Sequence, residues 1–118
     1  MSESIIQKKS FKFALMILEF YKEMIKHNEF IISKQLLRCG TSIGANVEEA
    51  LAGQSKKDFI AKMTIASKEA RETHYWLRLI KESNLINTDI ETILKETEEI
   101  IKILTSIVKT SQLKITHN

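Results

Sequence analysis

The sequence has no proline and only three glycines among its 118 residues. Proline breaks the interior of a helix and glycine destabilises it, so their scarcity beside abundant isoleucine, leucine, lysine and glutamate predicts an all-helical chain. Long apolar runs are missing too. The longest, Phe13 to Leu18, is far shorter than the roughly 20 residues that a membrane-spanning helix needs. We therefore expect one soluble domain over residues 1–118, with no membrane partner.

Cysteine is nearly absent, since Cys39 is the only one. A single thiol cannot form an internal disulfide, which indicates a reducing compartment or indifference to redox conditions. Residues 1–11 contain no apolar segment long enough for a secretory signal, so we expect a cytoplasmic protein. The net charge is only +3, from 18 basic and 15 acidic residues. The distribution of charge therefore says more about partners than its sum.

Apolar residues recur at helical spacing in four segments, and the second begins near either Asn28 or Ser33. Short connections make consecutive helices antiparallel neighbours. The sequence therefore predicts an all-α, antiparallel up-down-up-down four-helix bundle. The expected helices cover residues 5–27, 30–52, 56–83 and 88–112.

Local signals mark two of the connections. Gly53 suits a residue with positive φ just after a helix. Ser55 is followed three residues later by Asp58, in the manner of a capping box that starts the third helix. Thr88 and Glu91 have the same spacing and predict a second capping box for the fourth helix.

The first helix carries two apolar rows, which together are wider than the core of a single bundle requires. The surplus favours an oligomer. The first row is Phe11, Ala14, Leu15, Leu18, Tyr21 and Ile25. The second row is Phe13, Ile17, Phe20 and Met24.

The expected second helix carries a polar stripe within an arc of roughly 80°. Its members are Gln35, Arg38, Ser42, Asn46 and Glu49. If the second and third helices are antiparallel, facing residue numbers sum to about 108 to 110. This register places Arg38 opposite Glu72, and we predict an ion pair there, with Ser42 and Asn46 hydrogen-bonded beside it. Such a pair would fix the register of the two helices. The alternative is that the polar stripe contacts a ligand or nucleic acid.

Gly40 and Gly44 lie one turn apart on the same helix. Each costs about 1 kcal/mol relative to alanine inside a helix, so a neighbour is expected to approach this surface closely. That neighbour is either another helix of the same bundle or a second subunit.

No residue pattern predicts catalysis, a metal or a cofactor. The histidines lack the Glu-x-x-His spacing of bundle metal sites. Cys39 has no histidine nearby in sequence, so we interpret it as a small core residue. The segment from Gly40 to Gly44 lacks the P-loop spacing. We expect a protein that is not an enzyme; an enzyme would need a core pocket with converging titratable groups.

Lysines gather where the bundle topology places the chain start, the second turn and the chain end at one pole. The candidate contacts for nucleic acid are Lys8, Lys9, Lys12, Lys56, Lys57, Lys109 and Lys114. A basic pole attracts phosphate backbones. The alternative is a set of solvated lysines near helix ends.

Residues 35–77 resemble the small bacterial four-helix-bundle family known as S23 or 23S rRNA intervening-sequence proteins. The matching positions are Gln35, Arg38, Ser42, Ile43, Asn46, Glu49, Ser55, Lys57, Phe59, Ala66 and Glu72. The chain departs from the family pattern at Gly44, where proline is common, and at Gly53 and Gln54, where arginines are. The resemblance implies a non-enzymatic protein that assembles as a homopentamer. Similar proteins are accessory subunits of diversity-generating retroelements and bind RNA and a reverse transcriptase.

We therefore expect a homo-oligomeric module that binds RNA through its basic pole. The alternative is a protein-binding adaptor or scaffold that binds no nucleic acid.

Overall fold

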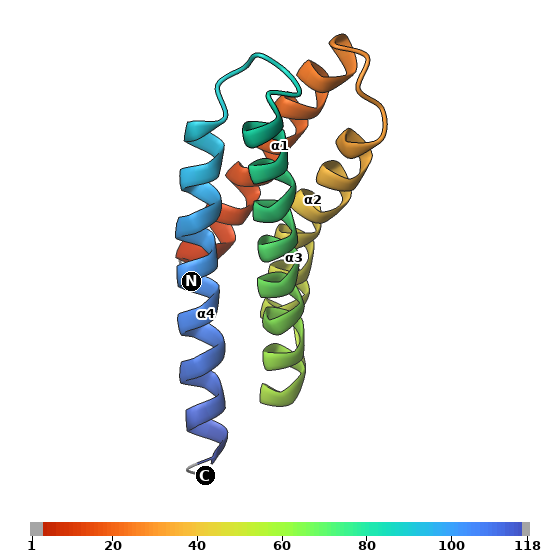
Figure 1. Ribbon diagram of the computed structural model, residues 1–118. Coiled ribbons are helices and arrows are strands. Elements are labelled where there is room, and N and C mark those ends of the chain that lie inside the picture. The colour runs from red at the N-terminus through yellow and green to blue at the C-terminus, as the bar shows by residue number, and fades with distance from the viewer. Residues whose placement is uncertain (1–3, 117–118) are drawn as a thin grey trace.

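The computed structural model describes residues 4–116, with side chains to residue 114. Four helices form an all-α up-down-up-down bundle, as predicted (Figure 1). They are α1 (Ile5–Lys26), α2 (Ile32–Leu51), α3 (Lys56–Ser83) and α4 (Glu91–Thr116). Within residues 4–116, no helix combines the length and the apolar character needed to cross a membrane.

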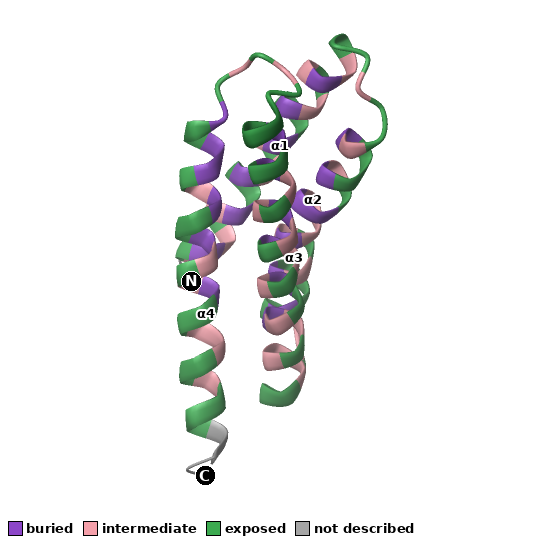
Figure 2. Ribbon diagram, viewed as in Figure 1, coloured by how far each residue is buried: buried purple, intermediate pink, exposed green. Residues whose placement is uncertain are grey.

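Apolar side chains from all four helices meet along the bundle axis, where the buried residues of Figure 2 gather. The second predicted row of α1 is the buried one, and Phe13, Ile17 and Met24 are fully inaccessible. In α4 the core includes Thr97 and Ile100, both fully buried. Thr97 is accommodated because its hydroxyl donates to the carbonyl of Ile93 at 2.6 Å, so no polar group is left unpaired.

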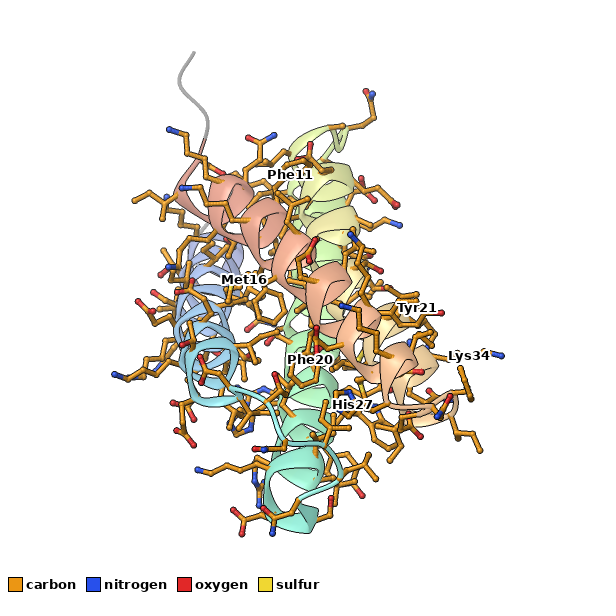
Figure 3. All side chains as sticks on the ribbon, turned by 90° about the horizontal axis from the view of Figure 1, so that it is seen from above. Phe11, Met16, Phe20, Tyr21, His27 and Lys34 are labelled. Carbon is orange, nitrogen blue, oxygen red and sulfur yellow. The ribbon has the colours of Figure 1, made fainter. Side chains whose placement is uncertain are left out.

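The first predicted row of α1 remains largely outside the core. Phe11 is 61% exposed, Leu15 51% and Leu18 42%. Figures 1 and 3 show the reason: α1 crosses the other helices obliquely, with Met16 on its α4 side and Tyr21 on its α2 side. The bundle uses one of the two apolar rows and leaves the other at the surface, as the excess width of the pattern predicts.

Both helical glycines serve packing inside the bundle. A Cβ atom on Gly40 would lie 2.7 Å from Cδ1 and Cγ1 of Ile17, and one on Gly44 would lie 3.3 Å from the carbonyl oxygen of Ser10. Helix α1 therefore presses on α2 where α2 has no side chains. The sequence left open whether this neighbour is another helix of the same bundle or a second subunit. In the structure it is a helix of the same bundle, α1.

The α2–α3 turn is built differently from the prediction. Gly53 does not have positive φ. Glycine allows close packing at this position, because a Cβ atom there would lie 2.6 Å from Oδ2 of Asp58 and 3.1 Å from the carbonyl oxygen of Ala50. The cap of α3 is as predicted, since the Ser55 hydroxyl accepts from the backbone N–H of Asp58 at 3.1 Å.

The starts of α2 and α4 are capped by carboxylates that the prediction missed. Helix α2 starts at Ile32, next to Ser33 rather than Asn28, but Ser33 is not its side-chain cap. The carboxylate of Glu29 accepts from the backbone N–H of Ser33 at 2.7 Å. The prediction of a Thr88–Glu91 capping box is wrong. Asp89 accepts from the backbone N–H of Glu91 at 3.1 Å and from the hydroxyl of Thr92 at 2.9 Å, and α4 starts at Glu91. Capping requires only an oxygen within reach, and glutamate and aspartate supply it here.

We predict that Gly40→Ala destabilises the protein by about 1 kcal/mol, because overpacking of about 1–3 kcal/mol against Ile17 exceeds the helix propensity gained. Urea denaturation followed by circular dichroism measures the change. In an Ile17→Ala background the same substitution should cost less, because the clashing atoms are gone. Stabilisation by Gly40→Ala alone would show that α1 does not approach α2 this closely.

Candidate nucleic-acid interface

The end of the bundle where α3 starts and α4 ends carries a cavity of about 500 Å³. Lys56 and Lys114 line it from these two helices, although they are 58 positions apart in sequence (114 − 56). Ser55 and Ser111 add hydroxyl groups, and the ring of Phe59 is half-buried in the wall. The antiparallel order of the helices thus brings together two of the lysines predicted to share a pole.

A second basic groove runs between α3 and α4 next to this end. Lys109 lines it together with Lys68 and Arg71, and its volume is about 230 Å³. Arg71 is held in place because its guanidinium donates to the hydroxyl of Thr105 at 3.1 Å. Lys68 and Arg71 were not among the sequence candidates. The signal that could have found them is their spacing from Lys57, which puts all three on one side of a helix.

The three lysines of α1 do not join this end in the way predicted. The Lys9 ammonium lies 3.0 Å from Oε1 of Glu96 and 3.8 Å from Oε1 of Glu99, in the first half of α4. The hydrogen bond to Glu96 holds the pKa of Lys9 above its ordinary value. Because α1 crosses obliquely, its start lies beside the middle of α4 rather than at its end (Figure 1). The prediction of one common pole is therefore wrong for Lys9.

The remaining candidate lysines are exposed, and no carboxylate of the described residues lies within ion-pair distance of any of them. They are Lys8, Lys12, Lys56, Lys57, Lys109 and Lys114. Two acidic side chains near the basic end are engaged elsewhere. Glu49 pairs with Lys62 at 2.8 Å, and both carboxylate oxygens of Glu48 accept from the amide of Gln7 at 3.1 and 3.2 Å. A third, Asp58, lies beside Gly53 in the first turn of α3. The charges of these lysines are consequently available to a partner.

The polar stripe of α2 contains the predicted ion pair. The Arg38 guanidinium donates to the carboxylate of Glu72 and also lies 3.4 Å from Oε2 of Glu69. The indole N–H of Trp76 donates to Glu72 at 3.0 Å. This hydrogen bond, followed by Arg38, keeps the pKa of Glu72 below its ordinary value. The Glu49–Lys62 pair sums to 111 and Arg38–Glu72 to 110, so both obey nearly the predicted register.

Ser42 and Asn46 are hydrogen-bonded, but only to the backbone of their own helix. The Ser42 hydroxyl donates to the carbonyl of Arg38 at 2.7 Å, and the Asn46 amide donates to the carbonyl of Ser42 at 2.8 Å. Gln35, at the other end of the stripe, is exposed. The interhelix contacts of the stripe are therefore made by its charged members.

Comparison with known proteins identifies the family. The profile of the family described as 23S rRNA-intervening sequence protein matches residues 2–106. The chain belongs to this family. A crystal structure of a protein of unknown function from the S23 ribosomal protein family, from Bacteroides thetaiotaomicron VPI-5482, is 47% identical in sequence with a TM-score of 0.85. The match covers 89% of this chain and 99% of the Bacteroides chain. No curated protein matches.

The family match spans α1 to most of α4, and the positions that carry the resemblance in the sequence lie in α2 and α3. Arg38, Glu49 and Glu72 join the two helices, while Ser55 starts α3. Lys109 and Lys114 lie beyond the matched range of residues 2–106. The basic end of this family member consequently includes residues that are not part of the family match.

Within the described part of the protein, few side chains are placed to act as nucleophiles or metal ligands. Burial raises the pKa of the Cys39 thiol to about 11, which makes it a poor nucleophile at neutral pH. Across residues 4–116, no three His, Cys, Asp or Glu side chains are grouped closely enough to hold a metal ion. The lysines and hydroxyls at the basic end are groups that can bind phosphate.

We predict that Glu72→Gln lowers the free energy of unfolding at pH 7 by roughly 0.2–1 kcal/mol, the range for partly exposed ion pairs. Because the pKa of Glu72 is lowered in the folded state, the carboxylate stabilises above its unfolded pKa of about 4.3 and ceases to do so as the pH falls through the folded pKa. The difference between wild type and variant should therefore vanish in acid. Urea denaturation from pH 7 to pH 2.5 measures it.

The exposed Glu82→Gln variant on the same helix is the control, and its effect on stability should be small throughout. A Glu72→Gln effect that stays constant down to the lowest pH would mean that the charge of Glu72 does not link the two helices.

Proposed function

We propose that this 23S rRNA-intervening sequence family member is a non-enzymatic, cytoplasmic, homo-oligomeric module that binds RNA through the basic end of α3 and α4. The supporting observation is the meeting of Lys56 and Lys114 at one cavity, beside the groove that holds Lys109. Cations that have no carboxylate partner among the described residues release counterions when they meet a phosphate backbone, and this release drives association. The family's name refers to 23S rRNA, which favours RNA as the polynucleotide to test first.

Assembly is the second half of the proposal, and the exposed apolar row of α1 supports it. Phe11, Leu15 and Leu18 follow one another at helical spacing, and each is more than two-fifths exposed. Beside Phe11, a shallow groove of about 180 Å³ between α1 and α2 is lined by small residues, among them Ala14, Thr41 and Ala45. A second copy of the chain would bury such a row, and a closed ring would do so for every subunit.

The subunit number in this proposal is five, as the family resemblance implies. A ring repeats the basic end of each subunit around its axis. Repetition raises the local field and the effective concentration of lysines for one RNA strand, so a modest basic patch becomes a strong one.

An adaptor that binds another protein is the competing function. The observation in its favour is a cavity of about 460 Å³ between α1 and α4, where Leu15 of the exposed row lies beside Phe20 and Ile93. A helix from a different protein fits such a surface. The adaptor would show no salt-sensitive retention of RNA.

For assembly, we predict a mass of several subunits by light scattering after gel filtration at micromolar concentration. Leu15→Glu should reduce the mass to that of a monomer, because it places a charge in the row that assembly would bury. Ile31→Glu is the matched control, since Ile31 is 76% exposed and outside the row. A monomeric wild type, or equal effects of both variants, would refute assembly through this row.

For binding, we predict that affinity for RNA falls steeply with salt and that Lys56→Glu/Lys114→Glu weakens it by at least about tenfold. Fluorescence anisotropy with a labelled RNA measures both. Lys34→Glu/Lys95→Glu is the control with the same change of charge, because these exposed lysines lie near the starts of α2 and α4, at the opposite end. Unchanged affinity in the first variant would refute binding at the basic end.

A further inference from the structure

One side of α3 carries cations and an aromatic ring at helical spacing. Lys57, Lys68, Arg71 and Tyr75 lie within about one quarter of the helix circumference, as their spacing at about 100° per residue requires. All four are exposed, and Tyr75 is 51% accessible. This basic face of α3 borders the α3–α4 groove, so charge and aromatic surface are combined in one strip.

The groove itself is shaped for phosphate groups. Lys68, Arg71 and Lys109 surround it, and Ser67 and Thr105 add hydroxyls. Its volume of about 230 Å³ is below the roughly 300–1,000 Å³ of small-molecule pockets. Arg71 is already oriented by its hydrogen bond to Thr105, so a phosphate oxygen would meet a donor whose position is set.

Two carboxylates of α3 are directed away from this face by α2. Glu69 and Glu72 of α3 point to α2, where Arg38 binds both. The next acidic side chain along the groove, Glu98, is 3.2 Å from the imidazole of His74. A polyanion approaching the basic face therefore meets little repulsion.

Tyr75 stands one turn beyond Arg71 at the end of the strip. Its ring packs edge-on against the ring of Trp76, with 5.3 Å between centroids and 70° between planes. Trp76 is in turn fixed by its hydrogen bond to Glu72. The tyrosine ring is thus supported from one side and remains half-exposed, which is the arrangement of a platform on which a base can stack.

We propose that the α3–α4 groove takes the phosphodiester backbone of single-stranded RNA and that Tyr75 stacks an unpaired base beside it. This inference rests on the proposed RNA-binding function and names its substrate class. A duplex hides the faces of its bases inside the stack, so a ring at the groove end distinguishes single strands from duplexes. Lysines and a fixed arginine hold the backbone whatever the base sequence.

The first test neutralises the groove. Fluorescence anisotropy of a 12-nucleotide single-stranded RNA, titrated at several salt concentrations, gives the slope of log K against log salt. Lys68→Gln/Arg71→Gln should make this slope shallower by about 1.4, the change for two lost phosphate contacts with a single strand. The control is Lys34→Gln/Lys95→Gln, which removes the same charge at the opposite end and should leave the slope unchanged.

The second test removes the platform. Tyr75→Ala should weaken binding of the single strand by roughly 5- to 100-fold, the cost of one lost stacking contact, and Tyr75→Phe should restore it. Binding of a 12-base-pair RNA duplex should be the same for all three proteins. Equal losses for single strand and duplex, or no loss in Tyr75→Ala, would overturn the stacking role.

The two proposals can fail separately. If the wild type binds RNA and Lys56→Glu/Lys114→Glu weakens it, while Lys68→Gln/Arg71→Gln has no effect, the groove is not the site but the basic end still is. If the wild type binds neither the single-stranded RNA nor the duplex at low salt, the proposed function itself is wrong. The assignment of the groove is then wrong as well.

Discussion

The contact between α2 and α3 is the constraint on which the other features of the molecule depend. A short turn at Gly53 makes the two helices antiparallel, and Arg38 then meets Glu69 and Glu72 across the interface. An arginine paired with two carboxylates has a preferred geometry, so the pair favours one register over its neighbours. The same contact sorts the charges of α3, because its carboxylates are drawn to the α2 side while Lys68 and Arg71 remain on the α4 side.

The close approach of α1 to α2 has a comparable effect on apolar surface. Gly40 and Gly44 let α1 press directly on the α2 backbone, which fixes the oblique path of α1. On that path only the row containing Phe13 and Ile17 reaches the core. The row of Phe11 is left at the surface, where burial by another chain would be favourable at roughly 25 cal/mol per Å². Two absent side chains in α2 thus decide which half of α1 faces solvent.

Much of the framework could be predicted because it depends on short-range rules. Helix periodicity, the Ser55 cap and the antiparallel arithmetic that pairs Arg38 with Glu72 each need only neighbouring residues and a turn. Two of the wrong predictions concern choices among near-equal local options. Asp89, and not Thr88, caps α4, because several residues near a helix end can satisfy the same backbone group. Gly53 allows close packing and does not adopt positive φ.

By itself, the sequence determined the helical class, the bundle topology, the small buried role of Cys39 and the presence of a surplus apolar row on α1. Only the tertiary structure decided how α1 crosses the bundle, and with it that Lys9 pairs with Glu96 instead of joining Lys114. It also brought Lys68 and Arg71 together with Lys109. The physical reason is that the topology determines which helix ends are neighbours but not the angles at which helices cross. Crossing angles depend on the side-chain volumes at all the contacts, which act together only when the core is packed.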